Sequence, residues 1–145
     1  MEYTKGTIGR VFLIKFVDDD VLIDQLILLA KKEKIKTASL IFIGALKNGD
    51  LVTGPKQPVI PPEPNRVAFK DGWEVMGMGT ILTNSKGPQL HIHASMGKKK
   101  KVLTGCLRGK SKVFLVVEAI IIELKGIKAS KDIDLKTGLN LLRII

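Results

Sequence analysis

The sequence predicts an α+β domain in which one long helix packs on a mostly antiparallel β-sheet. Only residues 21–34 place apolar side chains at helical spacing, whereas the second half of the chain is almost entirely strand-like. The chain has 145 residues, the size of one ordinary domain, and 45% of them are hydrophobic, enough to form a packed core. We therefore expect residues 1–145 to form a single domain.

The first half of the chain begins with a strand and a helix. Residues 10–16 are rich in β-branched and aromatic side chains, which is typical of a strand. Asp18, Asp19 and Asp20 follow, and we expect them to cap the helix over residues 21–34. These acidic residues before the helix and the lysines at its end both complement the helix macrodipole.

The remaining elements are predicted to be strands. Residues 38–46 are apolar enough for a strand that is buried on both faces, and Asn48-Gly49-Asp50 predicts a hairpin turn after it. Five prolines between residues 55 and 64 predict an extended surface loop within the domain. The further predicted strands cover residues 67–70, 73–83, 89–96, 102–107 and 112–124. In the tail, residues 139–145 are apolar enough to dock on the domain.

The composition favours a cytoplasmic protein and leaves open whether its positive charge binds anionic partners. The formal charge is +10 and the sequence pI is about 9.8, which suits nucleic acid or anionic ligands but also a solvated lysine-rich surface. The candidates for nucleic-acid contact are Lys98, Lys99, Lys100 and Lys101. No apolar run approaches the roughly 18 residues that span a bilayer, so we expect no membrane partner. The single cysteine, Cys106, allows no intrachain disulfide and fits a reducing compartment.

The only two histidines form the main chemical pattern. His91 and His93 lie two apart in a predicted strand, so their side chains leave the same face, as a zinc ion or a similar metal requires. As alternatives, the two histidines serve the structure or bind another ligand.

Cys106 strengthens the metal interpretation. If residues 98–101 form a four-residue hairpin loop, Gly97 pairs with Val102 and His93 pairs with Cys106. The candidate metal ligands are therefore His91, His93 and Cys106, with zinc as the expected ion and an open fourth position. A register slip of one residue would move Cys106 to the other face and destroy this site.

Several motifs resemble, in their order, those of the plant and prokaryote conserved (PPC) domain family. They are Ile43-Gly44-Ala45-Leu46, the strand Trp73-Glu74-Val75-Met76-Gly77-Met78-Gly79-Thr80-Ile81, Leu90-His91-Ile92-His93-Ala94-Ser95, Thr104-Gly105-Cys106-Leu107 and Asp134-Leu135-Lys136-Thr137-Gly138-Leu139. The resemblance covers almost the whole chain. It implies a mostly antiparallel sheet with a packed helix, assembled as a homotrimer. Many family members have a third histidine at about the place of Cys106.

The resemblance gives only partial support for DNA binding. In plants the domain accompanies an AT-hook, a short Arg-Gly-Arg-Pro element, and this sequence contains none. No helix-turn-helix is predicted either. Any DNA contact should therefore go mainly to phosphates and weaken strongly with salt.

Three functions follow from these patterns. We favour a homotrimeric binding module with a DNA-binding or regulatory role and a metal or small-ligand site. The alternative is a zinc-dependent hydrolase or lyase, in which zinc activates water. It would need an acid or base near the metal, and Glu118 is the candidate, although Glu118 can equally pair with a basic side chain at a subunit interface. The third is a structural trimer whose histidines are incidental. No catalytic residue is assigned.

Overall fold

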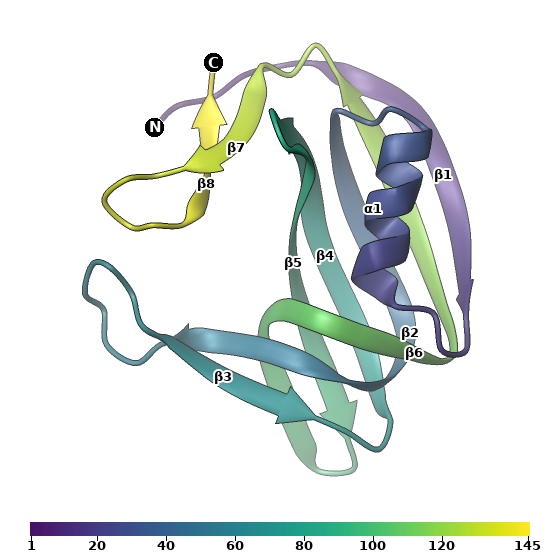
Figure 1. The fold of residues 1–145 in the computed structure, drawn as a ribbon. Coiled ribbons are helices and arrows are strands. Elements are labelled where there is room, and N and C mark those ends of the chain that lie inside the picture. Colours follow the sequence, from purple (N-terminus) through teal and green to yellow (C-terminus); the bar gives the residue numbers. More distant parts are fainter.

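The structure, a computed structural model, describes all 145 residues and contains one helix and eight strands (Figure 1). The elements are, in chain order, β1 (Thr7–Val17), α1 (Leu22–Lys32), β2 (Thr37–Pro55), β3 (Pro64–Phe69), β4 (Trp73–Asn84), β5 (Gly87–Lys98), β6 (Lys101–Lys125), β7 (Ala129–Ile133) and β8 (Asn140–Ile144). Every strand pair is antiparallel. The predicted α+β class with a mostly antiparallel sheet and one helix is confirmed.

The main sheet curls back on itself through β6. Its strand order is β1-β6-β5-β4-β2-β3, and β6 also pairs with β2. The first residues of β6 pair with β5, and the rest of this long strand pairs with β2 and β1. Strands β6, β2, β4 and β5 therefore form a closed ring of pairings, whereas β7 and β8 form a separate hairpin.

Helix α1 covers only one face of this sheet. Its buried residues Leu22, Leu26 and Ala30 recur every four positions, so they form one apolar stripe against the core. The opposite face carries exposed apolar side chains from three strands. We call these residues the uncovered face: Leu13, Ile41, Ile43, Met76 and Met78. In β2, Ile41 and Ile43 alternate with the buried Leu40 and Phe42, as expected when successive side chains point to opposite faces. No helix has the length and apolar character needed to cross a bilayer.

The expected capping of α1 by the aspartates is wrong. Val21 occupies the N-cap position, and no side chain there forms a capping hydrogen bond. Asp20 Oδ2 instead accepts a hydrogen bond from the Val17 amide at 2.9 Å, and Asp18 Oδ1 accepts one from the Leu115 amide at 2.8 Å. The carboxylates satisfy backbone donors at the end of β1 and in β6, so they are not available to the helix.

The hairpin turn predicted at Asn48-Gly49-Asp50 is also wrong. Strand β2 continues to Pro55, and its pairing with β6 shifts register on both sides of Asn48. Such β-bulges bend a strand without ending it. The chain reverses in the proline-rich loop, where Pro55 pairs with Pro64. The two strands predicted over residues 102–107 and 112–124 form one bent strand, β6.

The tail docks only some of its apolar residues. Leu139 and Leu141 line a cavity with residues of β2 and β5, whereas Leu142 and Ile145 are exposed, at 62% and 74%. A polar contact also joins the β7–β8 hairpin to the main sheet, because Asn84 Nδ2 donates a hydrogen bond of 2.7 Å to the Lys131 carbonyl. In Figure 1 the hairpin, in yellow, stands across from the loop between β2 and β3.

Candidate metal centre

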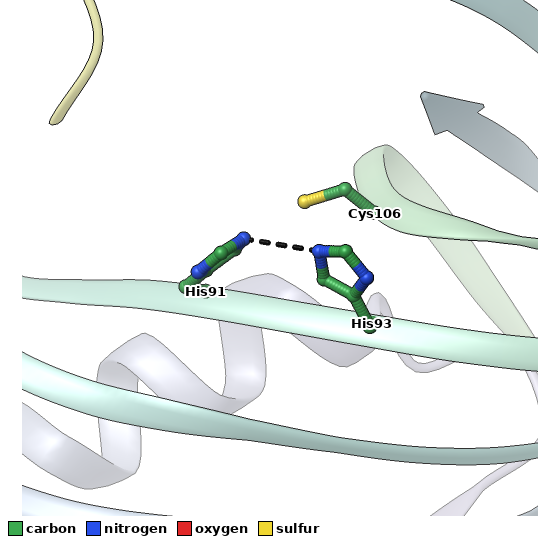
Figure 2. Close-up of side chains that lie close together, drawn as sticks. All are labelled: His91, His93 and Cys106. Carbon is green, nitrogen blue, oxygen red and sulfur yellow. Dashed lines mark hydrogen bonds between the residues drawn. The ribbon is translucent and has the colours of Figure 1, made fainter. Parts of the chain in front are cut away.

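Strand β5 presents His91 and His93 side by side. Their Nε2 atoms are 3.2 Å apart, and the rings lie at 78° to each other (Figure 2). At this distance one neutral imidazole donates a hydrogen bond to the other. In a tetrahedral zinc site with Zn–N bonds of about 2.05 Å, two nitrogens are about 3.3 Å apart. The two nitrogens are therefore already spaced to bind one ion.

Cys106 faces the histidines from β6. His93 lies opposite Cys106 and Gly97 lies opposite Val102, which is the register expected from the sequence. The connecting loop is shorter than the four residues expected, because Lys98 pairs with Lys101. The ligand atoms of His91, His93 and Cys106 all lie within 4.8 Å of one another. Figure 2 shows the sulfur on the same side of the strands as both imidazole rings.

Two glycines permit the close strand spacing at this site. A Cβ at Gly79 in β4 would lie 2.3 Å from the His91 carbonyl oxygen. A Cβ at Gly105, next to Cys106, would lie 2.5 Å from the Val52 carbonyl oxygen of β2. Real Cβ atoms do not approach so closely, so glycine at both positions lets β4, β5, β6 and β2 come together around the three ligands.

The surroundings keep His91 neutral. Burial, assisted by the charges of Lys131, His93 and Arg108, lowers the pKa of His91 to about 4. Metals bind the neutral imidazole, so at neutral pH His91 needs no deprotonation to act as a ligand. Burial also lowers the pKa of Lys131, and the nearby Cys106 opposes this shift.

Glu118 does not join the three candidate ligands. It is exposed on β6 and lines a cavity of about 540 Å³ with the uncovered face, whereas the ligands line a different cavity. His93 alone lines both cavities. The hydrolase or lyase alternative thus has no carboxylate beside the three ligand atoms.

The four candidate lysines lie at the tip of the β5–β6 hairpin, away from the histidine cavity. Lys98 donates a hydrogen bond to the Asp71 carbonyl. Lys99, Lys100 and Lys101 are exposed.

Sequence reasoning missed three basic residues near the histidines. Arg66, Arg108 and Lys131 line the cavity that contains the candidate ligands. Arg108 follows Cys106 by two positions in β6, so strand alternation could have placed it near the thiol. No local signal points to Arg66 or Lys131, because both reach the site only through the fold of β3 and β7.

Comparison with known proteins identifies a matching protein family. Residues 3–125 match the sequence profile of the Plants and Prokaryotes Conserved (PCC) domain, the PPC domain named above. A plant- and prokaryote-conserved protein from Pyrococcus horikoshii is 27% identical, with a TM-score of 0.86 over 100% of this chain and 99% of that chain. No curated protein sequence matches this chain.

Two more distant structures share the fold. A metal-containing protein from Archaeoglobus fulgidus is 22% identical and has a TM-score of 0.86 over 99% of both chains. A provisionally assigned DNA-binding protein from Ralstonia eutropha JMP134 is 18% identical and has a TM-score of 0.76, over 92% of this chain and 90% of that chain.

Proposed function

The chain belongs to the Plants and Prokaryotes Conserved domain family, and on that premise we propose that it is a homotrimeric binding module holding one metal ion per chain. Residues 1–145 act as one domain in this proposal, because the tail beyond the family match lines the same cavity as the candidate ligands. A reduced Cys106 thiol is also required, which fits the cytoplasm.

The observation that carries the metal proposal is the convergence of His91, His93 and Cys106. All three ligand atoms lie within 4.8 Å of one another, and the two imidazole nitrogens are already 3.2 Å apart. These are three potential metal ligands on one face of two paired strands, the donor types that zinc binds. The Archaeoglobus fulgidus protein of the same fold is described as metal-containing, which supports a metal in this fold.

Zinc suits this donor set best. Two imidazoles and one thiolate combine nitrogen and sulfur donors, which zinc accepts in tetrahedral geometry. Three protein ligands leave a fourth position open. No carboxylate accompanies these ligands, so we propose that the open position binds a ligand and does not activate water for catalysis.

The uncovered face supports the trimer. Leu13, Ile43 and Met78 are 81%, 58% and 66% exposed on one side of the sheet, although the helix buries the other side. Apolar patches of this kind mark protein contacts. In the trimer this face would pack against a second copy of the chain, with Glu118 among its few charged groups.

A DNA-binding or regulatory role is the second part of the proposal. Its support is the net charge of +10, together with the provisional DNA-binding assignments of fold relatives from Ralstonia eutropha and Bacteroides thetaiotaomicron. Lys98, Lys99, Lys100 and Lys101 would contact phosphates, because lysine neutralises charge without reading bases.

Metal analysis of untagged purified protein tests the proposal. We expect about one zinc per chain, none in His91→Ala, and reduced occupancy in Cys106→Ser because a hydroxyl is a poor ligand. A protein that holds no metal after purification and after incubation with zinc would overturn the metal site.

A further inference from the structure

The cavity beside the candidate metal ligands has the size of a small-molecule site. Its volume is about 660 Å³, within the usual range for ligand pockets. Its walls come from three parts of the chain that are far apart in sequence: the proline-rich loop, the β5–β6 hairpin and the tail hairpin. Apolar side chains, among them Val52, Leu90, Leu139 and Leu141, form part of the lining.

Apart from the Cys106 thiol, the charged side chains of this cavity have one sign. Arg66, Arg108 and Lys131 line it, and no aspartate or glutamate does. The ion pairs of the structure involve other basic residues, so none of these three cations has a carboxylate partner. Three uncompensated cations in one cavity attract an anion.

Of the three basic residues, Lys131 gives the strongest support for a bound anion. Its exposed fraction is 6%, and its ammonium group joins no ion pair. No buried side-chain nitrogen of the structure lacks a hydrogen-bond partner, so the unpaired ammonium group reaches the open cavity that Lys131 lines. Desolvation of the rest of the side chain disfavours its charge, and a ligand with an acceptor oxygen in the cavity would supply a partner.

We infer that this cavity binds a small organic anion, whose carboxylate or phosphate group is held by Lys131, Arg108 and Arg66 beside the open position of the metal. Arginine binds either group through paired hydrogen bonds. The apolar lining favours an anion with a hydrophobic body over a bare ion. The part of this inference that concerns the metal's open position rests on the proposed function, whereas the basic residues would attract the anion with or without the metal.

The test uses the 145-residue chain loaded with Co²⁺ in place of zinc. A thiolate-to-cobalt absorption band reports metal binding by itself, and a change in the visible cobalt bands on titration reports an anion at the open position. Acetate, benzoate, inorganic phosphate and phenyl phosphate separate carboxylate from phosphate and bare ion from hydrophobic body. Calorimetry with the metal-free protein measures anion binding independently.

We expect benzoate or phenyl phosphate to bind more tightly than acetate or inorganic phosphate. Lys131→Met and Arg108→Met should each weaken that binding at least tenfold, with or without cobalt. Arg108 is exposed, so its substitution remains informative if Lys131→Met fails to fold. Lys128→Met is the matched control, because Lys128 is an exposed tail lysine outside the cavity, and this variant should bind like the wild type.

The outcomes separate the two proposals. A cobalt–thiolate band without any anion binding would overturn the anion site and leave the metal centre standing. No cobalt band, but calorimetric binding that Arg108→Met weakens, would support the anion site and refute the metal centre. Equal binding by the wild type and the Lys131 and Arg108 variants would overturn the anion site. Binding of a short oligonucleotide in place of the small anions would also overturn it.

Discussion

His93 lies directly opposite Cys106 in the β5–β6 pair, so both side chains leave the same face of the sheet. Because side chains alternate along a strand, a slip of one residue would separate them. The register is held on both sides of the hairpin. On β5, His91 and His93 pair with Thr80 and Met78 of β4. On β6, Cys106 also pairs with Val52 of β2.

Gly79→Ala should damage both the fold and the site. The new Cβ would lie 2.3 Å from the His91 carbonyl oxygen, so β5 must move away from β4 at the first histidine. We expect a loss of stability of about 1–3 kcal/mol, as for other overpacked sites, together with reduced zinc occupancy. Urea denaturation and metal analysis measure the two effects.

Gly97→Ala is the matched control for this prediction. Gly97 lies on β5, the strand next to β4, and a Cβ there would meet nothing within 4 Å. This variant should keep its zinc and nearly all its stability. If both variants behave alike, close approach at Gly79 does not position His91.

The metal-free protein should lose stability on acidification through His91. Its pKa is about 4 in the fold and ordinarily 6.5, so the unfolded chain binds the proton more readily between these values. The contribution is fully present above about pH 6.5 and is lost as the pH falls towards 4. Because the side chain is only partly buried, solvent screening reduces this contribution to on the order of 1 kcal/mol.

Urea denaturation at pH 7.5, 5.5 and 4.5 measures this loss, with His91→Gln as the comparison. The variant carries no titrating group at this position, so its stability should fall less over the same interval. Parallel pH profiles for the two proteins would show that His91 is not desolvated in the fold.

Met78→Glu should dissociate the proposed trimer. Met78 is 66% exposed on the uncovered face, between Ile41 of β2 and His93 of β5, and a carboxylate buried there between subunits would incur a desolvation cost. Light scattering should give three chains for the wild type at micromolar concentration and one for the variant. Leu28→Glu, at a 58% exposed position on α1, should remain trimeric. A wild-type mass of one chain would refute the trimer.

DNA binding should be weak and strongly dependent on salt. For each phosphate that the protein neutralises, the slope of log affinity against log salt steepens by about 0.9. Replacing Lys98, Lys99, Lys100 and Lys101 together with glutamine should therefore reduce the slope by up to about 3.6, measured by fluorescence anisotropy on a random duplex. The control replaces four lysines around the end of α1: Lys31, Lys32, Lys34 and Lys36. If the two variants have the same salt slope, the hairpin lysines contribute no more to phosphate binding than the control lysines do.

Local sequence patterns were sufficient to predict the helix and most strands, because apolar periodicity and turn chemistry are encoded within a few residues. They failed where distant partners decide the structure. Asp18 accepts a hydrogen bond from Leu115, almost a hundred residues away, and so does not cap the helix. Asn48 has the chemistry of a turn residue, but its pairing with Lys112 of β6 keeps β2 running through it.

The candidate site also has one part that local sequence patterns predict and one part that they do not. Strand alternation and the spacing across one hairpin were enough to group His91, His93 and Cys106. The basic lining could not be predicted, because Arg66 and Lys131 come from β3 and β7, whose positions depend on the curl of the whole sheet.

X-ray absorption at the zinc edge of the loaded wild-type protein tests the central claim most directly. Because Cys106 lies opposite His93 and both imidazole nitrogens converge, we predict a coordination sphere of two nitrogens, one sulfur and one further light atom. Cys106→Ser should remove the sulfur and leave the two nitrogens. A coordination sphere without sulfur in the wild type, or a sulfur signal that persists in Cys106→Ser, would contradict the site described here.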